Sequence, residues 1–290
     1  MLFSIATPTR NALPALKQCV GSVRAQHGVT HEHCIRDACS SDGTPSWLGS
    51  QPDLQWESKP DGGMYAAIND AWSHAHGDIL SWLNADEQYL PGTLATVATA
   101  FCDHPEVDLV WGNAIVVDPS GHPVAWRREI PLRSFYVRYV TLYAFSCTMF
   151  FRRRLWDTGV LKLDDTFKVI ADADLVMRLL ACGTRTLHLP SDLSLFGYSG
   201  ANLSITEARL KDDERARLRQ SHKIVAHRPL RIIARALRAA EKGVRGCYVS
   251  TPLSYDYALD ATPTHRHVTS QRTPSRFTLT PGKDEVQPHA

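Results

Sequence analysis

The chain has 290 residues, 43% of them hydrophobic and 21% charged, with a formal net charge of +2. A chain of this length can bury roughly three quarters of the surface it exposes when unfolded, which excludes general disorder, a collagen-like fibre and a small disulfide-stapled scaffold. The near-neutral charge gives no global basic field, so no nucleic-acid partner is expected.

The first two thirds of the chain alternate strand-like and helix-like segments. The predicted strands are residues 2–6, 34–37, 78–83 and 107–117. The predicted helices are residues 13–26, 64–76 and 92–102. Such alternation favours βαβ units, so we expect an α/β fold in which helices cover both faces of a mostly parallel sheet.

The last third of the chain differs in character. Residues 206–246 carry 12 Lys and Arg against 5 Asp and Glu, and they contain predicted helices at 206–219 and 229–245. From residue 247 the chain is rich in Thr, Pro, Ser and His and lacks a periodic pattern. We therefore divide the chain into an α/β domain at 1–205, a basic helical extension at 206–246 and a flexible tail at 247–290.

The cysteines and the apolar stretches bear on localisation. The 7 cysteines are odd in number and include no C-x-x-C pair, which favours reduced thiols in the cytoplasm. The first residues do not resemble a signal peptide, and the longest nearly apolar stretch, at 139–151, is shorter than the roughly 18 residues of a spanning helix. We expect a cytoplasmic protein, soluble or peripheral at the inner face of the membrane.

Polar clusters follow several predicted strands. They comprise residues 7–11, Asp37 with residues 41–44, and residues 84–87; a further acidic pair, Asp172 and Asp174, precedes a predicted helix. Ligands of parallel α/β sheets bind beyond the carboxyl ends of the strands. An Asp at such a position is more often a turn or helix cap than a ligand, so the order of the clusters carries more weight than any one of them.

Taken in order, these clusters resemble the motifs of family-2 nucleotide-sugar glycosyltransferases. Residues 35–44 are similar to D-x-x-S-x-D-G-T, residues 59–69 to P-D-x-G-I-Y-D-A-M-N, and residues 83–92 to L-N-x-D-D-x-y-x-P-G. The opening strand at 3–11, Gly77-Asp78-Ile79, residues 150–153 and residues 172–179 also match the family's pattern. The resemblance covers residues 1–205 and implies the family's GT-A fold.

The resemblance also implies roles for particular residues. Asp37 would accept the N3 hydrogen bond of uracil, Asp86 would hold a divalent metal (Mn²⁺ or Mg²⁺), and Asp172 would be the general base. The implied nucleotide-binding residues are Thr7, Pro8, Thr9, Asn11, Asp37, Asp42, Lys59, Asp61, Gly63 and Asn84. The implied activity is metal-assisted, inverting transfer of a sugar from a UDP-sugar to a hydroxyl of a glycan or lipid-linked acceptor in bacterial cell-surface polysaccharide synthesis.

Several alternatives stay open. Asp174 competes with Asp172 as the base, although an i,i+4 ion pair with Arg178 would explain it. Asn84, Ala66 and Ala171 depart from the family's acidic positions, which favours the alternative of a non-catalytic GT-A module that binds nucleotide-sugar or glycan. A nucleotidyltransferase lacks its phosphate loop here, and no P-loop or dinucleotide-binding motif is present.

The predicted helix at 229–245 has two separate stripes. Arg228, Arg231, Arg235, Arg238 and Lys242 form one stripe, and Leu230, Ile233, Leu237, Ala240 and Val244 form the other. In one interpretation the apolar stripe docks on the catalytic domain or on a second subunit of a homo-oligomer. In the other, the 228–245 helix lies on an anionic membrane surface.

Overall fold

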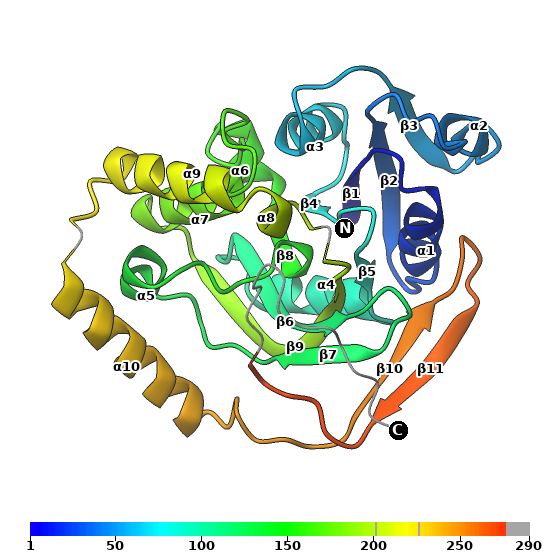
Figure 1. Ribbon diagram of the computed structural model, residues 1–290. Coiled ribbons are helices and arrows are strands. Elements are labelled where there is room, and N and C mark those ends of the chain that lie inside the picture. The colour runs from blue at the N-terminus through cyan, green and yellow to red at the C-terminus, as the bar shows by residue number, and fades with distance from the viewer. Residues whose placement is uncertain (201, 226, 277–290) are drawn as a thin grey trace.

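The computed structural model describes residues 1–200, 202–225 and 227–276 (Figure 1). The described residues form a nine-stranded sheet in the order β3-β2-β1-β4-β8-β6-β9-β5, with β7 paired to β6. The strands are β1 (Leu2–Thr9), β2 (Thr30–Asp37), β3 (Leu54–Ser58), β4 (Ile79–Trp82), β5 (Gln88–Tyr89), β6 (Leu109–Val117), β7 (Pro123–Arg127), β8 (Met149–Arg152) and β9 (Thr186–Gly197). Strands β3, β2, β1 and β4 are parallel, β6 and β9 are parallel, and β8 runs antiparallel to both of its neighbours.

Helices cover both faces of the sheet, which confirms the predicted α/β fold. They are α1 (Leu13–Arg24), α2 (Thr44–Leu48), α3 (Met64–Ser73), α4 (Thr93–Asp103), α5 (Ser134–Tyr139), α6 (Arg153–Asp157) and α7 (Ala171–Ala181), with a 3₁₀ turn, η1 (Ser146–Thr148). Side chains alternate along each strand. Phe3 and Ile5 therefore pack with α1 and α4 on one face, whereas Ala6, Leu80 and Trp82 pack with α3, α5 and α7 on the other.

Aromatic packing fixes the end of β4, from which the loop at residues 83–87 departs. Trp82 stacks on Phe151 of β8 with 5.9 Å between ring centroids, and Trp72 of α3 meets Trp82 edge-on at 5.5 Å. All three rings are buried. Large, interlocked rings hold their strands rigidly, so the loop after β4 starts from a fixed position.

Three helices follow the sheet: α8 (Leu203–Thr206), α9 (Ala208–Ser221) and α10 (Arg228–Val244). The last two match the helices predicted in the basic extension. In Figure 1, α9 lies beside α7, and α10 lies at the edge of the molecule next to α5. Each buries two residues only: Glu214 and Leu218 in α9, and Ala234 and Lys242 in α10.

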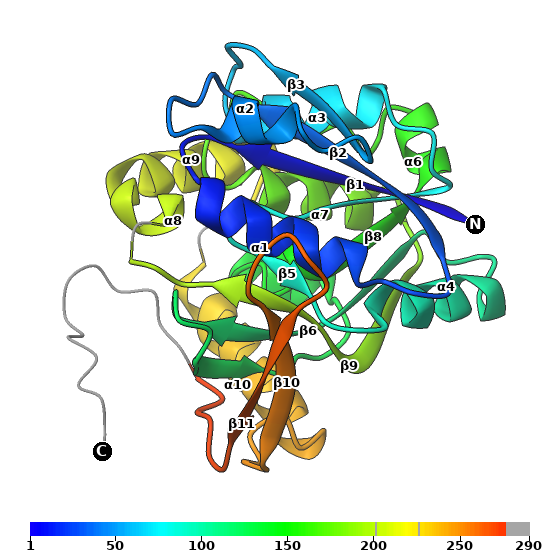
Figure 2. The ribbon, with the colours of Figure 1, turned by 90° about the vertical axis from the view of Figure 1, so that its right-hand side faces the viewer.

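The predicted tail does not hold for residues 253–270, which form a hairpin. Strands β10 (Leu253–Ala258) and β11 (His265–Ser270) pair antiparallel, and Tyr255, Tyr257 and Val268 pack with Ile115 of β6. Figure 2 shows the hairpin loop beside α1, where Arg24 donates a hydrogen bond to the Ala261 carbonyl at 2.9 Å. The alternating apolar pattern of β10 is short and is surrounded by Thr, Pro and His residues, so sequence reasoning did not identify it as a strand. Residues 277–290 of the predicted tail lie outside the described residues.

Candidate active site

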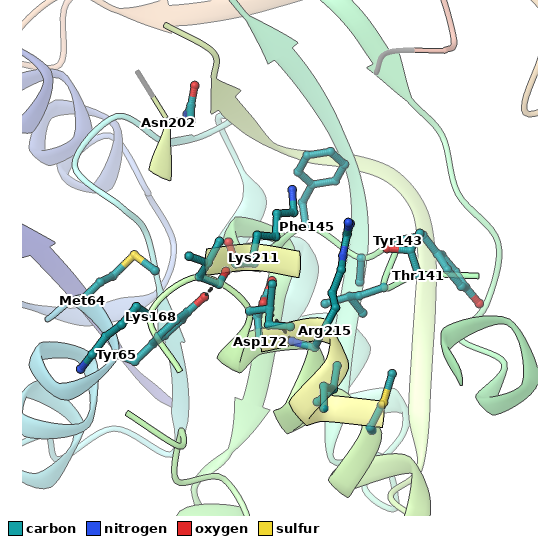
Figure 3. Close-up of a pocket in the computed structure, with 18 of the residues that line it drawn as sticks. Met64, Tyr65, Thr141, Tyr143, Phe145, Lys168, Asp172, Asn202, Lys211 and Arg215 are labelled. Atoms are coloured by element: carbon teal, nitrogen blue, oxygen red, sulfur yellow. Dashed lines mark hydrogen bonds between the residues drawn. The ribbon is translucent and has the colours of Figure 1, made fainter. Parts of the chain in front are cut away.

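A cavity of about 1030 Å³ lies at the carboxyl ends of the central strands (Figure 3). Its wall combines the end of β1, the loop after β4, the starts of α3 and α7, the α5–η1 segment, and side chains of α9 and α10. Seven of the residues singled out from the sequence line it: Pro8, Thr9, Asp61, Gly63, Asn84, Asp86 and Asp172. Elements far apart in the sequence thus bring the implied metal ligand and the implied base to one cavity.

The loop after β4 presents Asp86 to the cavity. The backbone amide of Asn84 donates a hydrogen bond to Glu87 Oε2 at 2.7 Å. The backbone amide of Glu87 donates back to the backbone carbonyl of Asn84 at 3.0 Å, which closes a tight turn. The Asp86 side chain is exposed within the cavity, 3.4 Å from the Asn202 amide nitrogen. Gly197 makes this approach possible, because a Cβ there would overlap the Asp86 carbonyl oxygen.

The same turn holds oxygens that suit a cation. Asn84 Oδ1 and Glu87 Oε1 are buried and have no hydrogen-bond partner among the described residues. Burial, and then the nearby charge of Asp86, raise the pKa of Glu87 to about 8. Carboxylate and amide oxygens are ligands for Mg²⁺ and Mn²⁺. The described part of the chain brings no three His, Cys, Asp or Glu side chains together as a metal site. The diphosphate and water would therefore complete the coordination shell of a bound cation.

Asp172 and Asp174, which the sequence left in competition, point to different places. Asp172 lies in the first turn of α7, lines the cavity, and accepts a hydrogen bond from the Ala173 amide at 2.9 Å. Asp174 is buried between Arg178, at 2.7 Å, and His222, at 2.8 Å. The predicted ion pair with Arg178 is present, and the carboxylate that faces the cavity is that of Asp172.

The environment of Asp172 weakens its acidity. Withdrawal from bulk water raises the pKa of Asp172 to about 6, although amide hydrogen bonds and the nearby Lys211 ammonium act in the opposite direction. Figure 3 shows Lys211 and Arg215 of α9 beside Asp172. A carboxylate with a pKa near 6 is a stronger base than an ordinary one and is still ionised at neutral pH.

Glu214 of α9 holds the segment that precedes Asp172, and sequence reasoning missed it. Its buried carboxylate accepts hydrogen bonds from the backbone amides of Lys168, Val169 and Ile170, at 2.5, 3.0 and 3.2 Å. The Tyr65 hydroxyl donates to the Val169 carbonyl at 2.9 Å from the opposite side. In the sequence, Glu214 follows two other acids in a charged helix, so no local signal sets it apart.

Asp37 and its neighbours lie beside the main cavity. Asp37 is buried at the end of β2 and accepts hydrogen bonds from the Ser40 and Ser58 hydroxyls, the latter at 2.5 Å. Together with Lys59 and Asp61 it lines a smaller hollow of about 220 Å³. Lys59 is paired with Glu57 at 2.8 Å and with Asp70 at 3.1 Å.

Asp61 connects the two hollows. Its side chain accepts the Gly63 amide hydrogen bond at 2.8 Å, and both residues line the large cavity. Gly63 has a φ of 108°, a conformation that favours glycine, and it directly precedes α3.

Three residues implied as nucleotide ligands line neither hollow. The Thr7 hydroxyl is bonded to His33 Nε2 at 2.8 Å in the interior. Asn11 Oδ1 accepts the Ser41 amide at 2.8 Å, and Asp42 accepts the Leu13 amide at 2.9 Å. Asn11 and Asp42 therefore tie the loop after β1 to the loop after β2, which are the turn roles that Asp and Asn often take.

Comparison with known proteins assigns the chain to a family. The profile of "Glycosyl transferase family 2" matches residues 4–160, more than half of the chain. The chain belongs to glycosyl transferase family 2. A PGL/p-HBAD biosynthesis glycosyltransferase of Mycobacterium bovis is 31% identical over 202 residues, which cover 65% of this chain and 74% of that protein. An uncharacterized glycosyltransferase of Mycobacterium tuberculosis is 35% identical over 113 residues, 38% of this chain and 43% of that protein, so this chain spans less than half of that relative's length.

Solved structures show the GT-A fold of the family. S. aureus TarS 1–349 in complex with UDP-GlcNAc superposes with a TM-score of 0.56 at 19% identity, over 68% of this chain and 59% of that chain. A mannosyltransferase from Pyrobaculum calidifontis in complex with GDP-Man and Mn²⁺ gives a TM-score of 0.54 at 17% identity, over 84% of this chain and 75% of that chain. At these identities the likeness extends to the fold alone.

The family-2 profile ends at residue 160, and the parts of the cavity wall beyond it are strongly basic. The basic side chains contributed from there are Lys168, Lys211, Arg215, Arg219 and Arg231. Sequence reasoning recognised the basic extension but did not direct any of its charges to the site. Two of them, Lys211 and Arg215, lie beside Asp172, so this wall adds positive charge next to an acidic side chain of the cavity.

Proposed function

We propose that this family-2 glycosyltransferase moves a sugar from a UDP-sugar to a hydroxyl of a glycan or lipid-linked acceptor, with inversion at the anomeric carbon. The observation that carries the proposal is the meeting of Asp86 and Asp172, from separate elements, in one cavity. The first suits the diphosphate side of the donor. The second suits the acceptor hydroxyl.

On the donor side, Asp86 would hold a divalent cation, with the unpartnered Asn84 Oδ1 as a second oxygen. When bound, Mn²⁺ or Mg²⁺ neutralises the charge that develops on the diphosphate leaving group. Asp37 retains free acceptor capacity beyond its serine hydrogen bonds, so it can accept the uracil N3–H. Pro8 and Thr9 would lie along the nucleoside.

On the acceptor side, Asp172 would be the general base. The acceptor oxygen forms a bond to the anomeric carbon as the bond to the diphosphate breaks, and the electron pair of that bond leaves with the diphosphate. The hydroxyl proton passes to Asp172, whose Oδ1 is held by the Ala173 amide. A single displacement of this kind inverts the anomeric configuration.

Acceptor and compartment are inferred from chemistry and relatives. A chondroitin synthase of Pasteurella multocida is 30% identical over 128 residues, 43% of this chain and 13% of that protein. With the mycobacterial PGL/p-HBAD relative, it supports a glycan or glycolipid acceptor in bacterial cell-surface polysaccharide. All seven cysteines are free, which supports a cytoplasmic site of action. No helix among the described residues is long and apolar enough to cross a membrane.

The test is a screen of nucleotide sugars for Mn²⁺-dependent release of free nucleotide, with UDP-GlcNAc first because a structural neighbour binds it. Release that requires Mn²⁺ and increases with an added acceptor is expected. Tight binding of UDP-sugars without any release would instead favour the non-catalytic module, in agreement with Ala66, Ala171 and Asn84.

A further inference from the structure

Helix α10 is oriented opposite to the interpretation in which its apolar stripe docks on the catalytic domain. The residues that face the domain are Ala234, Arg238 and Lys242. Arg238 and Lys242 both reach the buried carboxylate of Glu129, at 2.7 and 3.0 Å. Two cations of the basic stripe thus hold the helix to the domain, and the apolar stripe does not.

The apolar stripe of α10 is exposed instead, except for Leu230, which is half-buried. The exposed fraction is 48% for Ile233, 50% for Leu237 and 90% for Val244, and that of Ile232 is 61%. At roughly 100° per residue, the residues opposite the buried face are Pro229, Ile232, Ile233, Ala236, Leu237, Ala239, Ala240, Gly243 and Val244. Every one of them is apolar or glycine, so an uninterrupted apolar face about 25 Å long points away from the protein.

Arginines border this face. Arg228, Arg231 and Arg235 are exposed, and no acidic side chain among the described residues pairs with them. The single acid of α10, Glu241, is engaged by Arg133 and by the Tyr136 hydroxyl, both at 3.1 Å. The border is therefore cationic and complementary to an anionic surface.

The start of α10 reaches the cavity. Arg231, on the border of the apolar face, lines the cavity wall, as do Ile224 and Val225 just before the helix. Val225 is 62% exposed. An object that covers the outer face of α10 would therefore lie beside one rim of the cavity.

We propose that the outer face of α10 rests on an anionic lipid bilayer. Ile232, Ile233, Leu237 and Val244 would enter the boundary between headgroups and acyl chains, and the arginine border would contact anionic headgroups, the arrangement of an interfacial helix. The inference goes beyond sugar transfer, because vesicle binding does not depend on it. If both hold, the cavity opens beside the surface on which lipid-linked acceptors lie.

A second copy of the chain is the rival occupant. In an antiparallel two-fold contact through α10, the arginine borders of the two copies would lie against each other, and α10 has no free acid to separate them. An anionic bilayer meets the same border with opposite charge. The charge pattern thus favours lipid over self-association.

The experiment is flotation of the full chain with vesicles of phosphatidylcholine alone, or of phosphatidylcholine and phosphatidylglycerol in equal parts, at low and high salt. Wild-type protein is expected to float with the anionic vesicles at low salt and less at high salt, because the Debye length falls from about 10 Å at 0.1 M to about 3 Å at 1 M. Arg228→Gln and Arg235→Gln should each lower binding about fivefold at low salt.

The apolar face is tested by Ile233→Glu with Leu237→Glu, which should abolish flotation. Leu259→Glu, at a 44% exposed leucine away from α10, is the matched control and should float like wild type. Nucleotide release in solution should be the same for all these variants, so a loss of transferase activity and a loss of lipid binding are read separately.

Three results would overturn the proposal. The first is wild-type protein that stays with the unbound fraction at low salt. The second is equal flotation of the Ile233→Glu, Leu237→Glu variant. The third is a wild-type dimer, detected by sedimentation without lipid, that this variant converts to a monomer; the face would then be an interface between copies.

Discussion

Two regions of the described chain withdraw carboxylates from water and treat their charge in opposite ways. One region is the seam that joins α9 and α10 to the sheet domain, where Glu129, Asp174 and Glu214 lie. The other, the cavity floor, comprises Asp172, which lines the cavity, and Glu87, which is buried in the turn that presents Asp86. The seam supplies each carboxylate with cations or amide donors. At the floor, burial outweighs the favourable contacts, and the pKa values of Glu87 and Asp172 are raised.

Glu129 and Glu87 show the difference most clearly. Burial alone would raise the pKa of Glu129, but the cations of Arg238, Arg127 and Lys242 hold that pKa below its ordinary value. Glu87 is equally buried, yet its charged neighbour is Asp86, and its pKa is raised to about 8. Seam carboxylates are completed structural contacts. No described cation pairs with Asp86 or Glu87, and a donor with its cation would bring the positive charge that their turn lacks.

The largest expected effect is the loss of turnover when Asp172 on the cavity floor is changed. Asp172→Asn keeps the shape of the base but removes its capacity to accept a proton, so kcat should fall by roughly 10²–10⁴ while donor affinity stays the same. Asp174→Asn is the matched seam variant. It breaks the contacts to Arg178 and His222 and should lower thermal stability with little change in kcat. Steady-state kinetics and melting curves check both, and a reversed pattern would make Asp174 the base.

The next effect is on stability, at the seam. Glu129→Gln leaves three cations without their common partner and should lower the free energy of unfolding by about 3–5 kcal/mol. Glu87→Gln replaces a carboxyl group that lacks cationic partners and that its raised pKa keeps largely protonated at neutral pH, so it should leave the metal-free protein as stable as wild type or more so. Arg133→Gln, in a half-exposed pair with Glu241, should cost about 1 kcal/mol or less. Equal losses of unfolding free energy for Glu129→Gln and Glu87→Gln, measured by urea denaturation, would refute the division into two regions.

A smaller effect is expected where the seam supports the floor. Glu214→Gln weakens three amide hydrogen bonds to the segment before Asp172, and should lower stability by about 1–3 kcal/mol and reduce kcat more than it changes donor KM. Asp213→Asn, one residue earlier and exposed, is the control and should change neither. A Glu214→Gln enzyme with wild-type kcat would contradict this prediction, because it would show that the seam contacts of Glu214 do not support catalysis at the floor.

The smallest predicted change is in the pH profile. Asp172 must be ionised to accept a proton, and its pKa is raised to about 6. The rate should therefore be constant above that value and fall about tenfold per pH unit below it. Asp172→Asn should lose this acidic limb in its residual activity. A wild-type rate that stays flat down to pH 4.5 would mean that another group takes the proton.

Much of this arrangement could be predicted from sequence because its signals are local. Strands β2 and β4 have compact apolar patterns; Asp37 ends β2, and the cluster with Asp86 directly follows β4. The rule that ligands bind at carboxyl ends of parallel strands then places both near one site. For Asn11 and Asp42 the structure shows contacts that tie two loops together, and in sequence such a residue looks the same as one that binds a ligand, so their role as nucleotide ligands stays a prediction.

The seam could not be predicted because its partners are distant in the chain. Glu129 meets Arg238 across 109 positions, and Glu214 meets Ile170 across 44. Helix α10 faces the domain with Arg238 and Lys242, which contact Glu129, and turns most of its apolar stripe outward. Periodicity identified the stripes but not which of them faces inward.

The most direct test of the central claim is calorimetric titration of UDP into wild-type protein and Asp86→Asn, each with Mn²⁺ and with EDTA. The variant removes the charge that would hold the cation and leaves the seam intact, so its melting temperature should match wild type. Wild-type protein should bind UDP tightly only with Mn²⁺, and Asp86→Asn should bind it weakly and equally in both conditions. Wild-type affinity that is the same in EDTA, or an Asp86→Asn protein with undiminished Mn²⁺-dependent binding, would contradict the account.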